Sequence, residues 1–308
     1  MSAVAIQRRG LPRRSYTSAR GNTRAGFAGR PLLGGGLLLA SCTSIQIGAA
    51  LARGTFAEVG PLGAVGWRFA IAAALALIVV RPRVRRWPAR RWRLVACFAL
   101  AAAANETCLY EALARLPLGV AVTLEFIGPI AVALTAGRGA RQLLCALVAL
   151  AGVALISITQ LTATPAGIGF GLAAAAGWAA YLIASERAGR DQRPQDNLAV
   201  SLALAALITA PLTLAHTAAL AGHRSTLVTL VIVACLGTLT PYGLELAALR
   251  RLPASTAGIL FSVEPAIACL VGLVALGQRL DLAQTLGLVL VVSAGANVLR
   301  CPDGSPPP

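Results

Sequence analysis

The feature that most constrains this chain is a series of apolar stretches, each long enough to cross a lipid bilayer. A helix that spans the hydrocarbon core needs roughly 20 predominantly apolar residues. Ten stretches fit this description: 32–51, 61–80, 94–113, 118–136, 142–159, 167–185, 197–217, 227–248, 256–276 and 282–299. The connections between them are short. We therefore expect an all-α membrane protein with ten transmembrane helices and no sizeable soluble domain.

The net charge of +16 would suggest nucleic-acid binding if the charge were spread over a soluble surface. All 27 basic residues are arginine, and 22 of them fall on one predicted side of the membrane, four on the other and Arg68 inside the second span. Arginine in alternate connections marks the cytoplasmic side. We therefore expect both termini in the cytoplasm, contact with anionic membrane lipids and no nucleic-acid partner.

The two ends of the chain are predicted to be disordered tails, a basic cytoplasmic one at 1–31 and a proline-rich one at 300–308. A transit peptide is the alternative interpretation of the first tail. Six of the seven cysteines fall within predicted spans, and no pair has metal-ligand spacing. We expect no metal, cofactor or disulfide.

An internal repeat divides the spans into two halves. Residues 112–129 (ALARLPLGVAVTLEFIGP) and 248–265 (ALRRLPASTAGILFSVEP) share eight of 18 positions when they are aligned without gaps. The same alignment superposes the first span on the sixth, and five is odd, so the second half enters the membrane from the opposite side. Inverted halves of this kind are typical of secondary transporters, which bind substrate at the interface near the midplane and expose it alternately to each side. The predicted repeats are 32–160 and 167–299.

Six ionisable residues fall within the predicted spans, where charge is costly and usually functional. They are Arg68, Glu106, Glu111, Glu125, Glu245 and Glu264. Counted along the helix axis from the predicted ends of their spans, Glu125 and Glu264 approach the midplane from opposite sides, on equivalent faces of equivalent helices.

Five acids cannot all pair with one arginine, so we interpret Glu125 and Glu264 as sites for protons or for a substrate ammonium. Arg68 could pair with Glu125 or Glu106, or bind a substrate carboxylate; structural ion pairs are the alternative for all these charges. Glu111 lies near the outer end of its helix, where we expect it to reach water.

Three prolines inside predicted spans are candidate helix breaks: Pro129, Pro241 and Pro265. Proline removes a hydrogen bond and so frees the carbonyl four residues earlier, here those of Glu125, Gly237 and Phe261. A freed carbonyl is tolerated where it lines a cavity or meets a neighbouring group, although kinks for packing would explain the prolines equally well. Further candidates to line a cavity are Gln46, Asn105, Tyr110, Trp178 and Tyr181, of which the last two could instead face lipid.

Four segments resemble the EamA-type proteins of the drug/metabolite transporter superfamily, closest to its bacterial threonine/homoserine exporter branch. They are LPLGVAVTLEFIGPIAVAL (116–134), GWAAYLIASERAG (177–189), LTPYGLELAALRRLP (239–253) and SVEPAIACLVGLVALGQRL (262–280). The resemblance implies ten spans, an inner-membrane location and proton-driven efflux of small amino acids. It carries over Arg68, Asn105, Glu125, Glu245 and Glu264 as matching positions. Glu106 and Glu111 depart from the family pattern.

Other functions remain open at this point. The same fold could export another small metabolite or a drug, or the chain could be a scaffold or sensor that transports nothing. An intramembrane enzyme is disfavoured because the sequence contains neither HExxH nor GxGD. A duplication within one chain makes a monomer sufficient.

Overall fold

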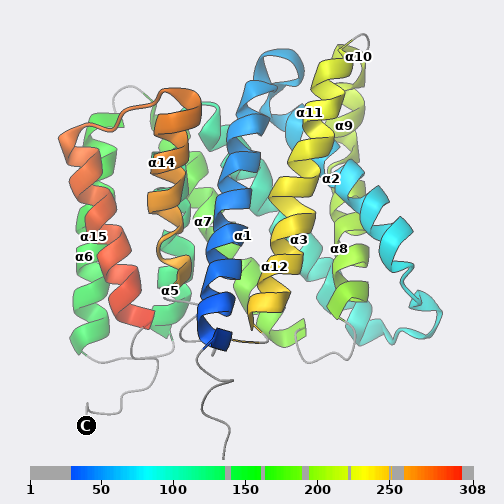
Figure 1. Ribbon diagram of the computed structural model, residues 1–308, viewed down its shortest axis with the longest axis horizontal. Coiled ribbons are helices and arrows are strands. Elements are labelled where there is room, and N and C mark those ends of the chain that lie inside the picture. Colours follow the sequence, from blue (N-terminus) through cyan, green and yellow to red (C-terminus); the bar gives the residue numbers. More distant parts are fainter. Residues whose placement is uncertain are drawn as a thin grey trace, which may run out of the picture.

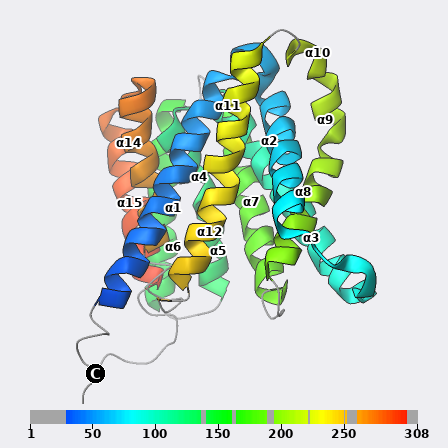
Figure 2. The ribbon, with the colours of Figure 1, turned by 45° about the vertical axis from the view of Figure 1, so that its right-hand side comes forward.

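The computed structural model describes residues 29–135, 140–160, 164–188, 194–220, 223–249, 251 and 260–299. All regular structure within these ranges is helical, and the helices stand side by side in one bundle (Figures 1 and 2). The elements are α1 (Gly29–Gly54), α2 (Phe56–Val80), η1 (Val84–Arg86), α3 (Ala89–Leu113), α4 (Leu118–Glu125), α5 (Ile127–Thr135), α6 (Ala140–Gln160), α7 (Pro165–Ala188), α8 (Pro194–Ile208), α9 (Ala210–Ala215), α10 (Thr217–Leu220), α11 (Arg224–Ala234), η2 (Cys235–Leu239), α12 (Thr240–Leu249), α14 (Glu264–Leu276) and α15 (Leu282–Leu299).

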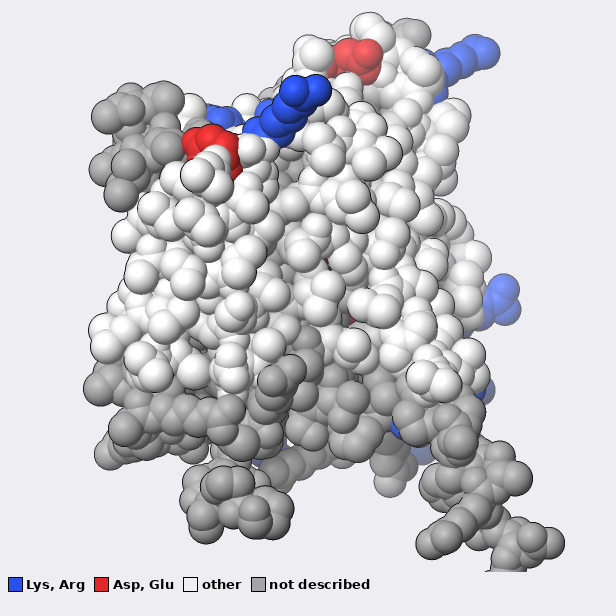
Figure 3. Space-filling model, turned by 60° about the vertical axis from the view of Figure 1, so that its left-hand side comes forward, with Lys and Arg blue, Asp and Glu red and all other residues white. Residues whose placement is uncertain are grey.

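Several helices are built to face lipid. Four segments are long and apolar enough to cross a membrane by themselves: Leu32–Gly54, Phe56–Val80, Ala89–Leu113 and Arg224–Glu245. Large apolar side chains point outward from the bundle, among them Val79, Leu214, Val274 and Leu282. Figure 3 shows one broad face whose middle is almost entirely uncharged, with charged side chains gathered at its margins. The chain is therefore a multi-pass membrane protein, because such a surface is stable only against hydrocarbon.

Two long pairings organise the centre of the bundle. Helix α1 packs along α11, η2 and α12, and helix α3 packs along α7. Small residues allow close approach in both pairs, as is usual between helices in lipid. A Cβ atom on Gly48 would lie 2.9 Å from the backbone nitrogen of Gly237, and one on Gly177 would lie 2.8 Å from the Cα atom of Asn105. The backbones therefore touch, and larger side chains would separate them.

Helix α2 contains a break just before the start of the predicted span 61–80. Gly60 has φ +66° and ψ 167°, outside the helical region, and Pro61 follows it directly. Glycine accepts a positive φ without steric strain. The predicted span 61–80 therefore matches the straight part of α2, and the structure adds one helical turn before it.

The helices are also interrupted near the three prolines singled out above. Phe126 separates α4 from α5, three residues before Pro129. The π-helix η2 ends two residues before Pro241. Pro265 stands in the first turn of α14, which begins at Glu264. Each break precedes its proline because the proline ring clashes with the carbonyl four residues earlier.

A fourth proline was missed by the sequence analysis. Pro211 lies within the predicted span 197–217, which the structure divides into α8 and α9 at Thr209. Of the predicted tail 1–31, residues 29–31 belong to α1, and residues 1–28 lie outside the described residues, as does the tail 300–308.

Candidate functional site

Arg68 forms the centre of a buried hydrogen-bond network between three helices. Its side chain is 9% exposed and donates from Nη1 to Glu106 Oε2 at 2.5 Å and to Tyr110 Oη at 3.2 Å. From Nε it donates to Thr238 Oγ1 at 3.0 Å, and from Nη2 to the carbonyl of Gly237 at 2.7 Å. All three guanidinium nitrogens are therefore engaged, and α2 is tied to α3 and to η2.

The partner of Arg68 on η2 is a carbonyl that the sequence predicted to be free. Pro241 cannot donate a hydrogen bond to Gly237, and the π-helix displaces the remaining backbone around it. The guanidinium also packs directly against Gly237, where a Cβ atom would lie 3.4 Å from Arg68 Cζ, in ordinary van der Waals contact. The acidic partner of Arg68 is Glu106; the sequence alone left open a pairing with Glu125.

Two other carboxylates are buried without an arginine as ion-pair partner in the described part of the chain. Glu125, the last residue of α4, is 7% exposed and accepts a hydrogen bond from Asn105 Nδ2 at 2.7 Å. Glu264, the first residue of α14, is 6% exposed and accepts one from Gln46 Nε2 at 3.0 Å. Within the described residues neither carboxylate forms an ion pair. Both therefore lie at helix breaks and are held by side-chain amides.

Helix α1 supplies hydroxyl donors to the second half of the chain. Ser41 Oγ lies 2.9 Å from Glu245 Oε1 and 3.3 Å from the carbonyl of Pro241. Ser44 Oγ donates to the carbonyl of Leu236 at 2.7 Å. The sequence analysis named Glu245 but neither serine. Their spacing along one helix face, with Gly48 next on it, is the signal that could have found them.

These groups share one electrostatic neighbourhood. The charges of Glu106 and Glu264 act on Glu125, and those of Glu106 and Glu245 act on Glu264. Tyr181 also lies within reach of the charges of Glu106 and Glu245. Its ring packs on Phe98 of α3 with centroids 4.4 Å apart. The structure thus brings the predicted site residues of both halves close to one another.

Trp178 occupies a different position on α7. Its ring meets that of Phe126, with centroids 6.0 Å apart, at the break between α4 and α5. Trp178 therefore packs at the helix break.

Glu111 does not reach water, so that expectation is wrong. Its side chain is 11% exposed and forms an ion pair with Arg115, which lies four residues further along the chain. Arg115 in turn lies over the ring of Phe170, with Cζ 4.9 Å from the ring centroid. The i, i+4 spacing brings the two charges together, and the ring of Phe170 packs on the guanidinium of Arg115.

The described residues contain no group of three or more His, Cys, Asp or Glu side chains able to hold a metal ion. What they contain is a set of ionisable side chains buried beside interrupted helices in a multi-pass membrane protein. That combination defines the class of secondary transporters.

Comparison with known proteins gives the family. Residues 165–299 match the EamA-like transporter family. The chain is 33% identical over 279 residues to "Threonine/homoserine exporter RhtA" of Salmonella typhimurium, covering 89% of this chain and 92% of that protein. It is 32% identical over 263 residues to the protein of the same name from Escherichia coli K12, covering 84% and 88%. The chain therefore belongs to the EamA-like transporter family of the drug/metabolite transporter superfamily, in the branch of these exporters.

A solved crystal structure shares the fold. It superposes with a TM-score of 0.56 at 19% identity and covers 88% of this chain and 96% of its own.

Proposed function

We propose that this chain exports small amino acids of the threonine and homoserine type from the cell by proton antiport with alternating access. The names of its relatives support the substrate class. The observation that carries the mechanism is the pair of buried carboxylates, Glu125 and Glu264, each of which is held by a side-chain amide and by no cation among the described residues. Burial disfavours an uncompensated charge, so each carboxylate must hold either a proton or a cationic ligand. When a proton and the cationic substrate replace each other at one carboxylate, proton entry is coupled to amino-acid exit.

An unmet acceptor beside Glu264 supports binding of the substrate ammonium there. Gln46 is 2% exposed, and its Oε1 atom has no hydrogen-bond partner in the described part of the chain, while its Nε2 atom donates to Glu264. A buried carbonyl oxygen without a donor is unfavourable by about 1–3 kcal/mol. A carboxylate and an unpaired amide oxygen side by side favour a ligand that brings several N–H donors. The ammonium of an amino acid has three.

Arg68 is proposed to receive the substrate carboxylate only in exchange for Glu106. All of its nitrogens are engaged, and Glu106 already supplies a carboxylate to Nη1. The substrate must therefore displace Glu106 to bind Arg68. Because Glu106 departs from the family pattern, this competition gives the chain its own selectivity, and another small metabolite is the alternative substrate. Asn105, Glu245 and Tyr181 complete the proposed site.

Pairwise contacts support the proposed inverted repeats, 32–160 and 167–299, with ten spans in all. Asn105 meets Gly177, and Pro241 meets Ser41. The alignment that places 112–129 on 248–265 also places Asn105 on Pro241 and Ser41 on Gly177. The same contact thus occurs twice with the roles of the halves exchanged, as a two-fold axis in the membrane plane requires. The freed carbonyls at Pro129 and Pro265 are proposed to line the cavity between the halves.

Orientation and location follow from the distribution of arginine. We propose an inner-membrane protein with both termini in the cytoplasm, acting as a monomer and without a cofactor. Residues 81–93, the connection between α2 and α3 together with the start of α3, carry seven arginines and are proposed to mark the cytoplasmic end.

The test is transport by purified protein in liposomes. Labelled threonine or homoserine is loaded inside, a pH gradient is imposed, and flux is compared between the natural protein and a Glu125→Gln, Glu264→Gln double variant. We expect gradient-dependent flux that the double variant loses, because glutamine cannot exchange a proton. Glu58→Gln is the matched control, since Glu58 is exposed and its carboxylate accepts a hydrogen bond from Thr226 Oγ1.

Each result bears on a different part of the proposal. Flux that ignores the gradient would refute proton coupling, and full flux in the double variant would refute the role of the two carboxylates. Absence of flux for both amino acids in folded protein would refute the substrate class and favour another metabolite or a drug. If no solute moves, the chain is a scaffold or sensor.

A further inference from the structure

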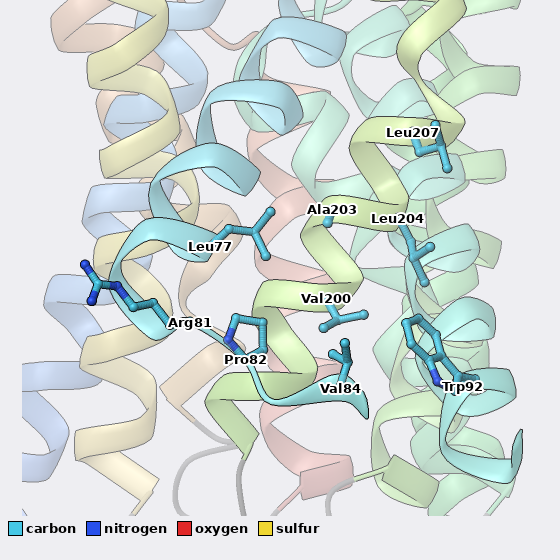
Figure 4. A pocket seen from close by; sticks show the side chains of 9 residues that line it. All are labelled: Leu77, Arg81, Pro82, Val84, Trp92, Val200, Ala203, Leu204 and Leu207. Atoms are coloured by element: carbon cyan, nitrogen blue, oxygen red, sulfur yellow. The ribbon is translucent and has the colours of Figure 1, made fainter. Parts of the chain in front are cut away.

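A groove separate from the buried carboxylates opens where α2, η1 and the start of α3 meet α8 (Figure 4). Its volume is about 520 Å³. Its lining consists of Leu77, Arg81, Pro82, Val84, Trp92, Val200, Ala203, Leu204 and Leu207. Figure 4 shows α8 at the back of the groove, with the chain from Arg81 to Val84 crossing one end.

The body of the groove is apolar and open to the hydrocarbon. Leu77 is 38% exposed and Leu207 is 70% exposed, and Ala203 between them presents only a methyl group. Residues this apolar remain exposed in a membrane protein because lipid chains cover them. The groove is therefore a recess that can hold part of an acyl chain.

One end of the groove is formed by η1, and this end is strongly basic. Val84, which lines the groove, is followed by Arg85 and Arg86, and Arg83 precedes it; all three arginines are exposed. The connection 81–93 contains seven arginines and no acidic residue. Arg81 lies at the rim, where its Nε donates to the carbonyl of Ile78 at 3.2 Å. This end therefore attracts a negatively charged group.

Two tryptophans place this end at the level of the lipid headgroups. The rings of Trp87 and Trp92 pack at a tilt of 54° with centroids 5.4 Å apart, and Arg91 Cζ lies 3.7 Å from the centroid of Trp87. Arg91 also donates to Asn197 Oδ1 of α8 at 2.9 and 2.7 Å. Tryptophan is enriched where the hydrocarbon core meets the headgroups. The Trp–Arg cluster therefore fixes α3 to α8 and sets the depth of the groove.

We propose that this groove binds one anionic phospholipid from the leaflet at the arginine-rich end of the bundle. One acyl chain lies along α8 between Leu77 and Leu207, and the phosphate contacts Arg83, Arg85 and Arg86. Basic pockets between transmembrane helices are suited to anionic headgroups. The chain's own first 28 residues are excluded as the occupant, because they contain arginine and no acid and would be repelled.

The experiment uses the full-length protein in phosphatidylcholine nanodiscs with a trace of phosphatidylglycerol that carries a photoreactive group in its acyl chain. Labelled peptides are located by mass spectrometry. We expect labels on α2 and α8, and competition by unlabelled phosphatidylglycerol about a hundredfold better than by phosphatidylcholine, since each basic residue contributes ~1 kcal/mol. Inorganic phosphate, compared with chloride at equal ionic strength, should not reduce labelling.

Two sets of variants distinguish the contribution of the lipid's acyl chain from that of its headgroup. Ala203→Trp fills the groove and should lower labelling by about tenfold or more, because at least two methylene groups are displaced at ~0.8 kcal/mol each. Val274→Trp, on the exposed face of α14, is the control and should leave labelling unchanged. Replacing Arg83, Arg85 and Arg86 by Gln should remove the preference for phosphatidylglycerol, and replacing them by Lys should retain it.

The proposal is overturned by any of three results. Equal competition by the two lipids would show that charge is not recognised. Unchanged labelling in Ala203→Trp would show that the acyl chain lies elsewhere. Displacement by inorganic phosphate would show a simple anion site. The lipid and phosphate competitions use the natural protein, so they decide the matter even if a variant fails to fold.

Discussion

Removing the charge of Glu106 should destabilise the protein strongly. Glu106→Gln keeps the size of the side chain but leaves the guanidinium of Arg68, which is 9% exposed, without an anionic partner. Breaking a buried ion pair on one side costs about 3–5 kcal/mol. Glu106 is itself 21% exposed, so water can partly replace it, and we expect about 3 kcal/mol. That corresponds to more than a hundredfold in the unfolding equilibrium.

The measurement is reversible unfolding in mixed micelles, followed by tryptophan fluorescence. A double variant, Arg68→Met with Glu106→Met, should recover most of the lost stability, because two apolar residues leave no buried charge behind. Glu111→Gln is the matched control. Its partner Arg115 is 37% exposed and keeps water as a partner, so we expect a loss of about 1 kcal/mol or less.

Equal losses in the free energy of unfolding for Glu106→Gln and Glu111→Gln would refute a large contribution from the buried ion pair of Arg68 and Glu106. That contribution is also refuted if the double variant is no more stable than Glu106→Gln. In either case Arg68 would owe its stability in the bundle to Tyr110, Thr238 and the carbonyl of Gly237.

Close helix packing and the amide donors give two further predictions, checked by the same unfolding measurement. Gly48→Val should lower the free energy of unfolding by about 1–3 kcal/mol, because a Cβ atom would lie 2.9 Å from the backbone of Gly237; Gly36→Val meets nothing within 4 Å and should have a much smaller effect. Asn105→Leu leaves Glu125 without its donor and should lower the free energy of unfolding by about 1–3 kcal/mol and reduce flux, and unchanged values for both would contradict the assigned contact.

Much of the helical architecture was predictable because lipid leaves few alternatives. An apolar stretch of about 20 residues must satisfy its backbone internally, and a helix does so. The helix breaks were partly predictable for the same reason: Pro129, Pro241 and Pro265 each free a carbonyl at a known position. Pro211 also removes a helical hydrogen bond, so the break before it could have been predicted from the sequence in the same way.

The partners of the charged residues were not predictable to the same degree. Sequence periodicity gives the face of a helix on which a residue lies, but not its height against a neighbouring helix. Arg68 could therefore be assigned to Glu106 or Glu125, and only the packing of α2 against α3 and η2 decides for Glu106. Glu111 was misjudged because its position near the helix end was taken as exposure, whereas its side chain is 11% exposed and paired with Arg115.

The π-helix η2 makes the length of its segment as important as its composition. A π-turn holds one residue more than the α-helix it interrupts. Deleting one residue of Cys235–Leu239 would let α11 and α12 join as a regular helix, and because the π-turn already absorbs one extra residue, the residues beyond it would keep their direction. Glu245 would keep the side that faces Ser41, whereas the carbonyls of Leu236 and Gly237 would lose the positions at which Ser44 and Arg68 bond them. A deletion scan should therefore distinguish η2, where the loss of one residue keeps the direction of Glu245, from the regular turns of α11 and α12, where the same loss rotates everything beyond it by about 100°.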